Sequence, residues 1–268
     1  MKSVYTGGEK VAEVESYDEL RVGENKPAFI YEGSELVYPN PVKDGLVLWY
    51  DFSGRTNADS QRGIAEDLSG NGNHGTLQNF NFTPESGYDK NRLLFDGVDD
   101  GIRQNITPSL EINEDITLES FLTFNQPHDL TDHYGWDWYI MCGNNQKVEA
   151  GFGLARESNG RLSFKYGGVN LITDYNPEPN TTHHLLAKFD GNKSELSFYL
   201  DGIRVSQSIR TDTKPQIPRR PLGIGYATYY SSPRAAVSIG SVKIYNRALT
   251  TEEIAHNYTI EKERFGIE

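Results

Sequence analysis

The stretch Ser197-Phe198-Tyr199-Leu200-Asp201-Gly202-Ile203-Arg204-Val205 decides the fold class of this chain. Asp-Gly is a preferred pair for the two central positions of a type I′ turn, because both positions need a positive φ. Alternating apolar side chains on either side of such a pair are typical of two strands that share a buried face. The stretch therefore predicts a β-hairpin and, with it, an antiparallel β architecture.

Similar apolar runs of strand length recur from about residue 45 onward, separated by Gly, Asn, Asp and Pro. This spacing is typical of a two-sheet antiparallel sandwich rather than of helices. Strands are expected at residues 46–52, 93–95, 116–122, 138–141, 161–166, 184–189, 197–200 and 203–205. One common core is expected to contain Leu48, Trp49 or Tyr50, Phe95, Phe121, Phe164, Leu186 and Phe198. An all-β sandwich is therefore the predicted fold.

A short helix is predicted near the end of the chain, over residues 250–258. Thr250 is followed three positions later by Glu253, which is the spacing of a capping box. In a capping box each of the two side chains accepts a hydrogen bond from the other residue's backbone N–H, so the first turn of the helix is stabilised.

Residues 1–44 differ from the rest, because they carry many charges and few bulky alternating residues. Within them Tyr5-Thr6-Gly7-Gly8-Glu9-Lys10-Val11 is repeated as Tyr31-Glu32-Gly33-Ser34-Glu35-Leu36-Val37. Each copy predicts a strand, a glycine turn and a second strand. Isolated hairpins of this size are marginally stable and need a partner surface. We therefore expect residues 1–44 to be an attachment or assembly arm, and residues 45–268 to be a sandwich that folds without it.

Composition excludes several classes of protein. The chain has 26 Lys and Arg against 38 Asp and Glu, a net charge of −12, so nucleic acid is not an expected partner. Apolar runs of the length of a secretory signal or a membrane span are lacking, so we expect a protein made in a cytoplasm without membrane insertion. Cys142 is the single cysteine, so no disulfide forms within the chain and packing must stabilise the fold.

Several segments together resemble the laminin-G-like jelly-roll family of the concanavalin A-like lectin/glucanase superfamily. They are residues 46–52, Asp67 to Leu77, Leu94 to Asp100, Phe198 to Gly202 and Val242 to Thr250, in the order of the family. The resemblance covers about residues 45–260. It implies a jelly roll of two facing sheets, with ligands met on the concave face or at rim loops. Members range from lectins to adhesins and inert spacers, so the fold does not decide the function.

The arm resembles hairpins in minor structural and tail proteins of phages that infect Gram-positive and related bacteria. The resemblance rests on the Tyr-x-Gly repeats and on Val37-Tyr38-Pro39. It implies a virion protein that is made in the host cytoplasm and needs no signal peptide. The implied partners are other virion proteins, bound through residues 1–44, and further copies of this chain in the particle.

Catalysis is not expected. Retaining glycoside hydrolases need two carboxylates about 5 Å apart on one strand face. The acids that come nearest to such a pair are in Glu111-Ile112-Asn113-Glu114-Asp115, which lies before the expected strand at 116–122 and not on it. The sequence has no Gly-x-Ser-x-Gly nucleophile elbow. Cys142 lies in an apolar strand, where an inert buried thiol is usual. The sequence therefore favours a protein that is not an enzyme.

Calcium is the one cofactor that the resemblance suggests, because the family often holds it between a sheet edge and loops. Asp67, Asn71 and Asn73 surround a glycine-rich turn and offer the oxygen ligands that calcium prefers. Family members place a further acid before the last strand, where this chain has Ile239-Gly240-Ser241-Val242. The alternative interpretation is that Asp67 caps a tight turn, with glycines supplying positive φ.

Aromatic residues gather in two segments that we interpret as rim loops. The first, residues 128–138, places His133, Tyr134, Trp136 and Asp137 close together, and the second contains Tyr229 and Tyr230. Aromatic faces bind the C–H surfaces of sugars and carboxylates accept hydroxyl protons, so these six residues are the candidate carbohydrate contacts. The alternative is that Trp136 and Trp138 pack into the sandwich core. His128 and His133 lack a third metal ligand at a fixed spacing.

Three functions follow from these observations. The first is a phage virion component of the tail, baseplate or a fibre, whose sandwich binds host surface glycans. The second is a purely structural decoration of the particle that binds no glycan. The third is a bacterial carbohydrate-binding domain of a larger protein.

Overall fold

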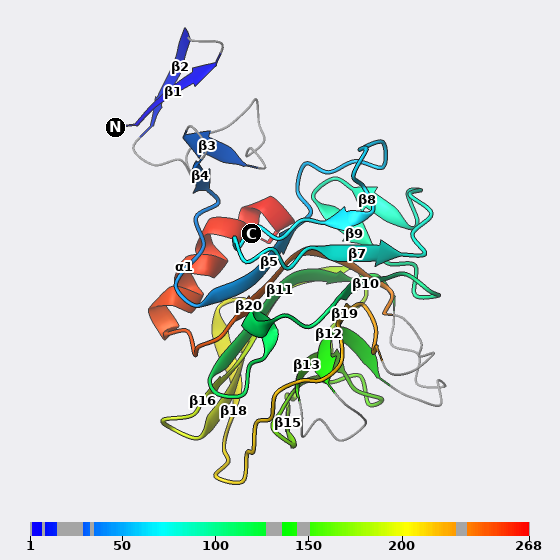
Figure 1. Ribbon diagram of the computed structural model, residues 1–268, viewed down its shortest axis with the longest axis vertical. Helices are drawn as coiled ribbons and strands as arrows, with labels where there is room; N and C mark the ends of the chain where they lie inside the picture. The colour runs from blue at the N-terminus through cyan, green and yellow to red at the C-terminus, as the bar shows by residue number, and fades with distance from the viewer. Residues whose placement is uncertain are drawn as a thin grey trace.

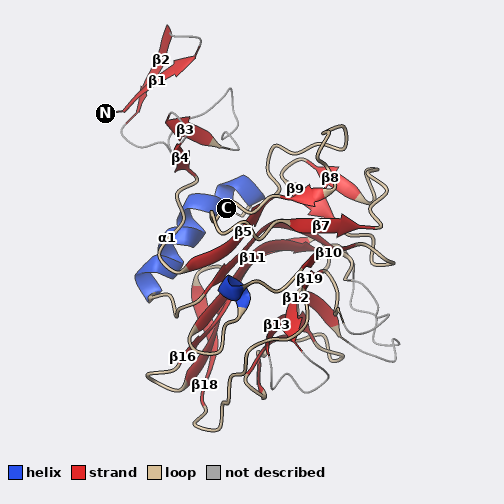
Figure 2. Ribbon diagram, viewed as in Figure 1, coloured by secondary structure: helices blue, strands red, loops and turns tan. Residues whose placement is uncertain are grey.

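The fold is described from a computed structural model, in which residues 2–6, 9–14, 29–32, 35–126, 136–143, 151–228 and 235–267 are described. Strands make up nearly all of the regular structure, with one α-helix near the C-terminus (Figure 2). The expected antiparallel sandwich is thereby confirmed. No helix in the described part of the chain has the length and apolar character needed to cross a bilayer.

Two eight-stranded sheets form the sandwich (Figure 1). Sheet I contains, in spatial order, β15 (Val169–Ile172), β14 (Leu162–Tyr166), β13 (Gly151–Arg156), β12 (Asp137–Gly143), β19 (Leu222–Ile224), β10 (Gly101–Gln104), β7 (Gly75–Gln78) and β6 (Ile64–Ala65). Sheet II contains β18 (Ile203–Ile209), β17 (Glu195–Leu200), β16 (Thr181–Asp190), β11 (Ile116–Phe124), β20 (Val237–Tyr245), β9 (Arg92–Leu94) and β8 (Gly87–Asp89), with β5 (Leu46–Asp51) paired to β20.

The predicted hairpin joins β17 to β18. Asp201 has a φ of 51° and Gly202 a φ of 77°, as a type I′ turn requires. The predicted capping box is also present at the start of α1 (Thr251–Glu261): the Thr250 side chain accepts from the Glu253 N–H, and the Glu253 carboxylate accepts from the Thr250 N–H. Short 3₁₀ turns lie at η2 (Pro108–Leu110) and η3 (Lys262–Phe265).

The arm contains two separate two-stranded sheets (Figure 1). One pairs β1 (Lys2–Thr6) with β2 (Glu9–Val14), and the other pairs β3 (Ile30–Glu32) with β4 (Glu35–Tyr38). These are the hairpins that the Tyr-x-Gly repeat predicted. Beyond β4 the chain contacts α1, where the Val42 N–H donates to the Asn257 side-chain oxygen at 2.9 Å.

The core between the sheets contains most of the side chains that the sequence assigned to it, namely Leu48, Tyr50, Phe95, Phe164 and Phe198. The assignment of Phe121 and Leu186 is wrong. Both are buried on the opposite face of sheet II, where Leu186 belongs to a second cluster with α1 and Phe121 packs on Phe265 with ring centroids 5.0 Å apart. Alternate strand residues point to opposite faces, and the C-terminal helix buries the face that would otherwise meet solvent.

Candidate glycan-binding site

Trp136 and Trp138 form an aromatic pair at the start of β12. Their rings are stacked, with centroids 5.5 Å apart and an interplanar angle of 17°. Trp138 belongs to a small cluster with Met141 and Ala155 that is separate from the core between the sheets. The two indoles therefore pack on the outer face of sheet I and not in the core between the sheets, and there Trp138 is buried while Trp136 is half-buried.

A bulge in β12 explains this placement. The pairing with β13 shifts between Trp138 and Ile140, so both Tyr139 and Ile140 join the core cluster while Trp138 and Met141 face outward. Bulges re-aim side chains in this way because one extra residue changes the alternation of the strand. The simple alternation read from the sequence contains no such shift.

Glycine on the neighbouring strand makes room for the indole. A Cβ atom at Gly153 of β13 would lie 2.4 Å from Cζ3 of Trp138, which is too close for any real side chain. The Trp138 ring therefore lies directly on the backbone of sheet I. Trp138 is thereby buried, and the half-buried Trp136 ring stacked on it is the part of the pair that is open to an apolar contact.

Lys165 completes the aromatic surface from β14. Its Nζ atom lies 3.2 Å from the centroid of the Trp136 ring and 5.6 Å from that of Trp138. The negative faces of the two indoles attract the ammonium group. Burial among these rings lowers the pKa of Lys165 to about 8. Lys165 is not predictable from the sequence pattern, because only the strand order of sheet I brings it to the tryptophans.

The two predicted rim loops leave the same end of sheet I. β12 begins at Asp137, and β19 runs antiparallel to it, with Ile140 opposite Ile224. The Gly225 N–H donates to the Tyr139 carbonyl oxygen at 3.0 Å, and Ala227 packs with Trp138. The described bases of both loops therefore meet at one rim. The predicted contacts His133, Tyr134, Tyr229 and Tyr230 lie outside the described residues.

Asp137 is half-buried and lies on the other side of the strand from the indoles, since neighbouring strand residues point to opposite faces. Burial, and after it the charge of Asp137, raise the pKa of Tyr139, a core residue. Asp137 is therefore separated from the Trp136 and Lys165 surface, although it borders the same rim.

The residues predicted to bind calcium form a closed hydrogen-bonded turn. The two carboxylate oxygens of Asp67 accept from the backbone N–H groups of Trp49 and Asn73, at 2.9 Å and 2.8 Å. The Asn73 side-chain oxygen accepts from the Thr107 hydroxyl, and the Asn71 side-chain nitrogen donates to a backbone oxygen. This geometry matches the turn-capping interpretation, and calcium at this turn stays a prediction.

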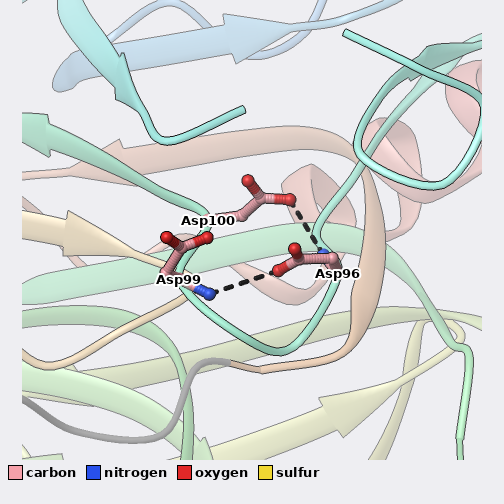
Figure 3. Close-up of side chains that lie close together, drawn as sticks. All are labelled: Asp96, Asp99 and Asp100. Atoms are coloured by element: carbon pink, nitrogen blue, oxygen red, sulfur yellow. Dashed lines mark hydrogen bonds between the residues drawn. The ribbon is translucent and has the colours of Figure 1, made fainter. Parts of the chain in front are cut away.

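A second acidic group, Asp96, Asp99 and Asp100, has carboxylate oxygens within 4.8 Å of one another (Figure 3). Asp96 accepts from the Val98 and Asp99 N–H groups, and Asp100 accepts from the Asp96 N–H at 2.9 Å. The Ser86 hydroxyl also donates to Asp100. These carboxylates hold the turn before β10, and their hydrogen bonds give no separate indication of a cation.

Asp100 makes stability depend on pH. Its burial raises the pKa to about 6 from an ordinary value of 3.8, so between these values the folded protein keeps a proton that the unfolded chain releases. This contribution stabilises the fold at low pH and is lost as the pH rises through 6. In urea unfolding at pH 4 and pH 7, wild type is therefore expected to lose stability relative to Asp100→Asn as pH rises. A difference that stays constant between the two pH values would contradict this.

An ion-pair network that the sequence analysis missed lies under α1. Lys243 Nζ is 3.2 Å from Glu119 Oε1 and 2.7 Å from Glu261 Oε2, and all three side chains are fully buried. Burial opposes ionisation of Glu119, but the Lys243 charge, together with the contacts of Glu119 with His184 and Asn257, outweighs it and lowers the pKa of this carboxyl. Because the helix seals the network from solvent, these carboxylates hold α1 on sheet II and do not meet a ligand.

One hydrogen-bonded chain on the surface has the order of a nucleophile relay. Asp201 Oδ2 lies 2.8 Å from His183 Nδ1, and His183 Nε2 lies 2.9 Å from the Tyr175 hydroxyl. Asp201 also accepts from the His184 N–H, so the group joins the turn after β17 to the segment before β16. The contacts position these loops. In a relay of this order the Tyr175 hydroxyl would be the nucleophile, so Tyr175 is included in the test for catalysis below.

Known structures share the fold at low sequence identity. Trypanosoma rangeli sialidase has a TM-score of 0.58 and 19% identity, over 84% of this chain and 34% of that chain. A mutant of HCR/D has a TM-score of 0.60 and 16% identity, over 81% and 53%. The binding domain of Paraclostridial Mosquitocidal Protein 1 has a TM-score of 0.56 and 17% identity, over 81% and 52%. This chain therefore spans about a third of the sialidase and about half of the other two.

No curated protein matches the chain by sequence. A family model does match, over residues 96–255, which is more than half of the chain. That model describes the concanavalin A-like lectin/glucanases superfamily. The match agrees with the two-sheet antiparallel architecture and with the family that the motifs resemble. The chain belongs to the concanavalin A-like lectin/glucanases superfamily.

Proposed function

We propose that this chain is a non-catalytic glycan-binding protein of a bacteriophage particle, which uses the outer face of sheet I to bind host surface polysaccharide. The observation that carries the glycan-binding part is the half-buried Trp136 ring, which stacks on the buried Trp138 ring and lies against the Lys165 ammonium group. A partly exposed indole held by neighbouring side chains offers an apolar face of the kind that sugar rings bind.

Two of the structural neighbours support a binding role in general terms. One is a sialidase, also described in complex with sialic acid, and another is a binding domain. Since identity is below 20% and the match covers only part of each, the likeness extends to the fold and carries no substrate over to this chain. The sugar must therefore be inferred from this chain's own residues.

The absence of catalysis belongs to the proposal. Glu111 and Glu114 are exposed in the segment between η2 and β11 and lie outside any sheet, not on a strand face as the paired carboxylates of a glycoside hydrolase do. Glu119 does lie on a strand, but it is sealed under α1. Retaining hydrolysis needs two accessible carboxylates about 5 Å apart.

The particle part of the proposal rests on the arm. Its two hairpins resemble those of phage tail and minor structural proteins, and their outer strand edges leave backbone groups free to pair with another chain. We propose that other virion proteins and further copies of this chain bind there. A role as a tail, baseplate or fibre component agrees with an arm that attaches and a sandwich that faces outward.

A polysaccharide-binding assay tests the glycan-binding part. Wild type is expected to bind at least one polysaccharide in a panel from bacterial surfaces, and Trp136→Ala is expected to weaken this by about tenfold or more, the effect of losing roughly 1.4 kcal/mol of contact. The polysaccharide should be recovered at unchanged length. Tyr31→Ala, which removes an exposed aromatic ring from the arm, is the matched control and should bind like wild type.

Three results would count against this proposal. Equal binding by Trp136→Ala and wild type would show that Trp136 on the outer face of sheet I does not contact the glycan. Shortened polysaccharide, with cleavage abolished by Glu111→Gln, Glu114→Gln or Tyr175→Phe, would make the chain an enzyme. If no polysaccharide binds, the structural-decoration function takes the place of glycan binding.

A further inference from the structure

The Lys165 ammonium group has no ion-pair partner among the described residues. None of them forms a hydrogen bond with it either, and it rests on the Trp136 ring. The titratable group that acts on it is Glu157, at the end of β13. Glu157 is itself buried, and its Oε1 accepts from the Asn170 side-chain nitrogen. A partly desolvated ammonium group in this position is stabilised by a negative charge brought from outside.

Two polar atoms beside Lys165 also lack partners. Ser163 precedes Lys165 by two positions on β14 and therefore shares its face of the sheet. Asn170 lies directly opposite Lys165 on β15. The Ser163 hydroxyl and the Asn170 side-chain oxygen are buried, and neither has a hydrogen-bond partner among the described residues. Buried polar atoms are rarely left unsatisfied, and such atoms point to a ligand or to water.

We infer that the outer face of sheet I binds a glycan that carries an anionic group, with the anion at the Lys165 ammonium and a sugar ring against Trp136. This inference rests on the proposed glycan-binding function and names the class of glycan. A ligand anion accepts a charge-assisted hydrogen bond from Lys165, which is about twice as strong as one between neutral groups. The Ser163 hydroxyl and the Asn170 oxygen are buried beside this group, where a bridging water would link them to the ligand.

A neutral sugar fits this surface less well. Its hydroxyl groups accept a hydrogen bond from the ammonium but do not neutralise the charge that the indoles have partly desolvated. The carboxylate of a uronic acid and the phosphate of a polyol-phosphate polymer both supply the charge. The shared chemistry is thus an anionic oxygen adjacent to an apolar ring face.

The experiment uses the full chain and a panel of bacterial surface polysaccharides in three classes: neutral, carboxylate-bearing and phosphate-bearing. Binding is measured at pH 7 and pH 9.5 for wild type, Lys165→Met and Lys165→Arg. Methionine keeps the apolar stem and removes the charge, whereas arginine keeps a charge at both pH values. Arg103→Met is the matched control, because Arg103 is an exposed cation on β10 of the same sheet.

Anionic polysaccharides are expected to bind wild type at pH 7, and Lys165→Met is expected to weaken this by at least about tenfold. Binding by wild type should fall at pH 9.5, because the pKa of Lys165 is lowered to about 8 and the charged form is lost as the pH rises through that value. Lys165→Arg should bind equally at both pH values, and Arg103→Met should resemble wild type. Whether the carboxylate or the phosphate class binds identifies the source of the anion.

The outcomes separate the inference from the proposed function. If neutral and anionic polysaccharides bind alike, or if Lys165→Met leaves anionic binding unchanged, the inference is overturned while glycan binding stands. If no class binds, both are overturned. Melting temperatures of the variants equal to that of wild type are required, so that a weaker interaction reflects the lost charge.

Discussion

Lys243→Met is expected to lower the free energy of unfolding by about 3–5 kcal/mol, as is typical when one partner of a buried ion pair is removed. Lys243 lies between Glu119 and Glu261, both fully buried, and its loss removes the cation that they share. His184 and Asn257 beside Glu119, and Arg264 beside Glu261, compensate only in part. Burial disfavours the charged forms of both carboxyls, so they should also take up protons more readily. Urea unfolding of wild type and variant at pH 7 measures the effect.

Lys193→Met is the matched control for this substitution. Lys193 forms an ion pair with Asp190 at 2.9 Å, but its side chain is 67% exposed, and such surface pairs contribute about 0–1 kcal/mol. A Lys243→Met variant that unfolds at the same urea concentration as Lys193→Met would contradict the importance of the buried network. A double variant, Lys243→Met with Glu119→Gln, should regain part of the lost free energy of unfolding, because one of the two buried carboxylates is then neutral.

The same network shows why part of the fold was predictable from the sequence and part was not. The hairpin at Asp201-Gly202 and the capping box at Thr250 are local, and each rests on residues within a few positions of one another. Glu119 and Lys243 are adjacent across β11 and β20, but they are far apart in the sequence. A charged residue in an alternating strand normally indicates a solvent-exposed face.

The error over Phe121 has the same origin. The sequence shows that sheet II has two faces, but not that α1 covers the second one. Once the helix is in place, apolar and charged side chains are both buried there, and Phe121 contacts Phe265 instead of the sandwich core. The terminal helix was predicted, but its packing partner depends on the complete sheet.

The candidate site was predictable only in its aromatic part. Trp136 was selected because aromatic residues are dense in its segment, and it lies half-buried on the outer face of sheet I, where its role in binding stays a prediction. Lys165 reaches it through the pairing of β12 with β13 and of β13 with β14. A contact across three strands leaves no local signal in the sequence. A lysine in an alternating strand looks the same whether or not it meets an aromatic ring.

Deletion of residues 1–28 is expected to abolish assembly without lowering the melting temperature of the sandwich. The deleted part contains the β1–β2 hairpin, a two-stranded sheet with no further strand paired to it among the described residues. Strand edges of this kind gain hydrogen bonds when another chain supplies a strand. Light scattering of the purified protein, and its incorporation into particles when added to an assembly reaction, measure the loss.

A longer deletion, to a chain that begins at Lys43, is expected to lose assembly and also stability. Tyr38 is only 2% exposed, and the Arg264 guanidinium lies 5.6 Å from the Phe29 ring and 5.8 Å from the Tyr38 ring. The Val42 N–H also donates to Asn257 on α1. Loss of a buried aromatic side chain typically costs about 3 kcal/mol or more. The sandwich should still fold, because the core between its sheets is complete without these residues.

The two deletions together separate attachment from folding. A chain beginning at Phe29 that melts like the full chain and fails to assemble supports an arm whose first hairpin acts only on its neighbours. If that chain still enters particles normally, the hairpin is dispensable and the attachment model fails. If it melts well below the full chain, residues 1–28 are part of the sandwich's own stability, and the arm is not a separate assembly element. The Lys43 chain then shows how much of the remaining stability the contacts of Tyr38 and Val42 with the C-terminal helix provide.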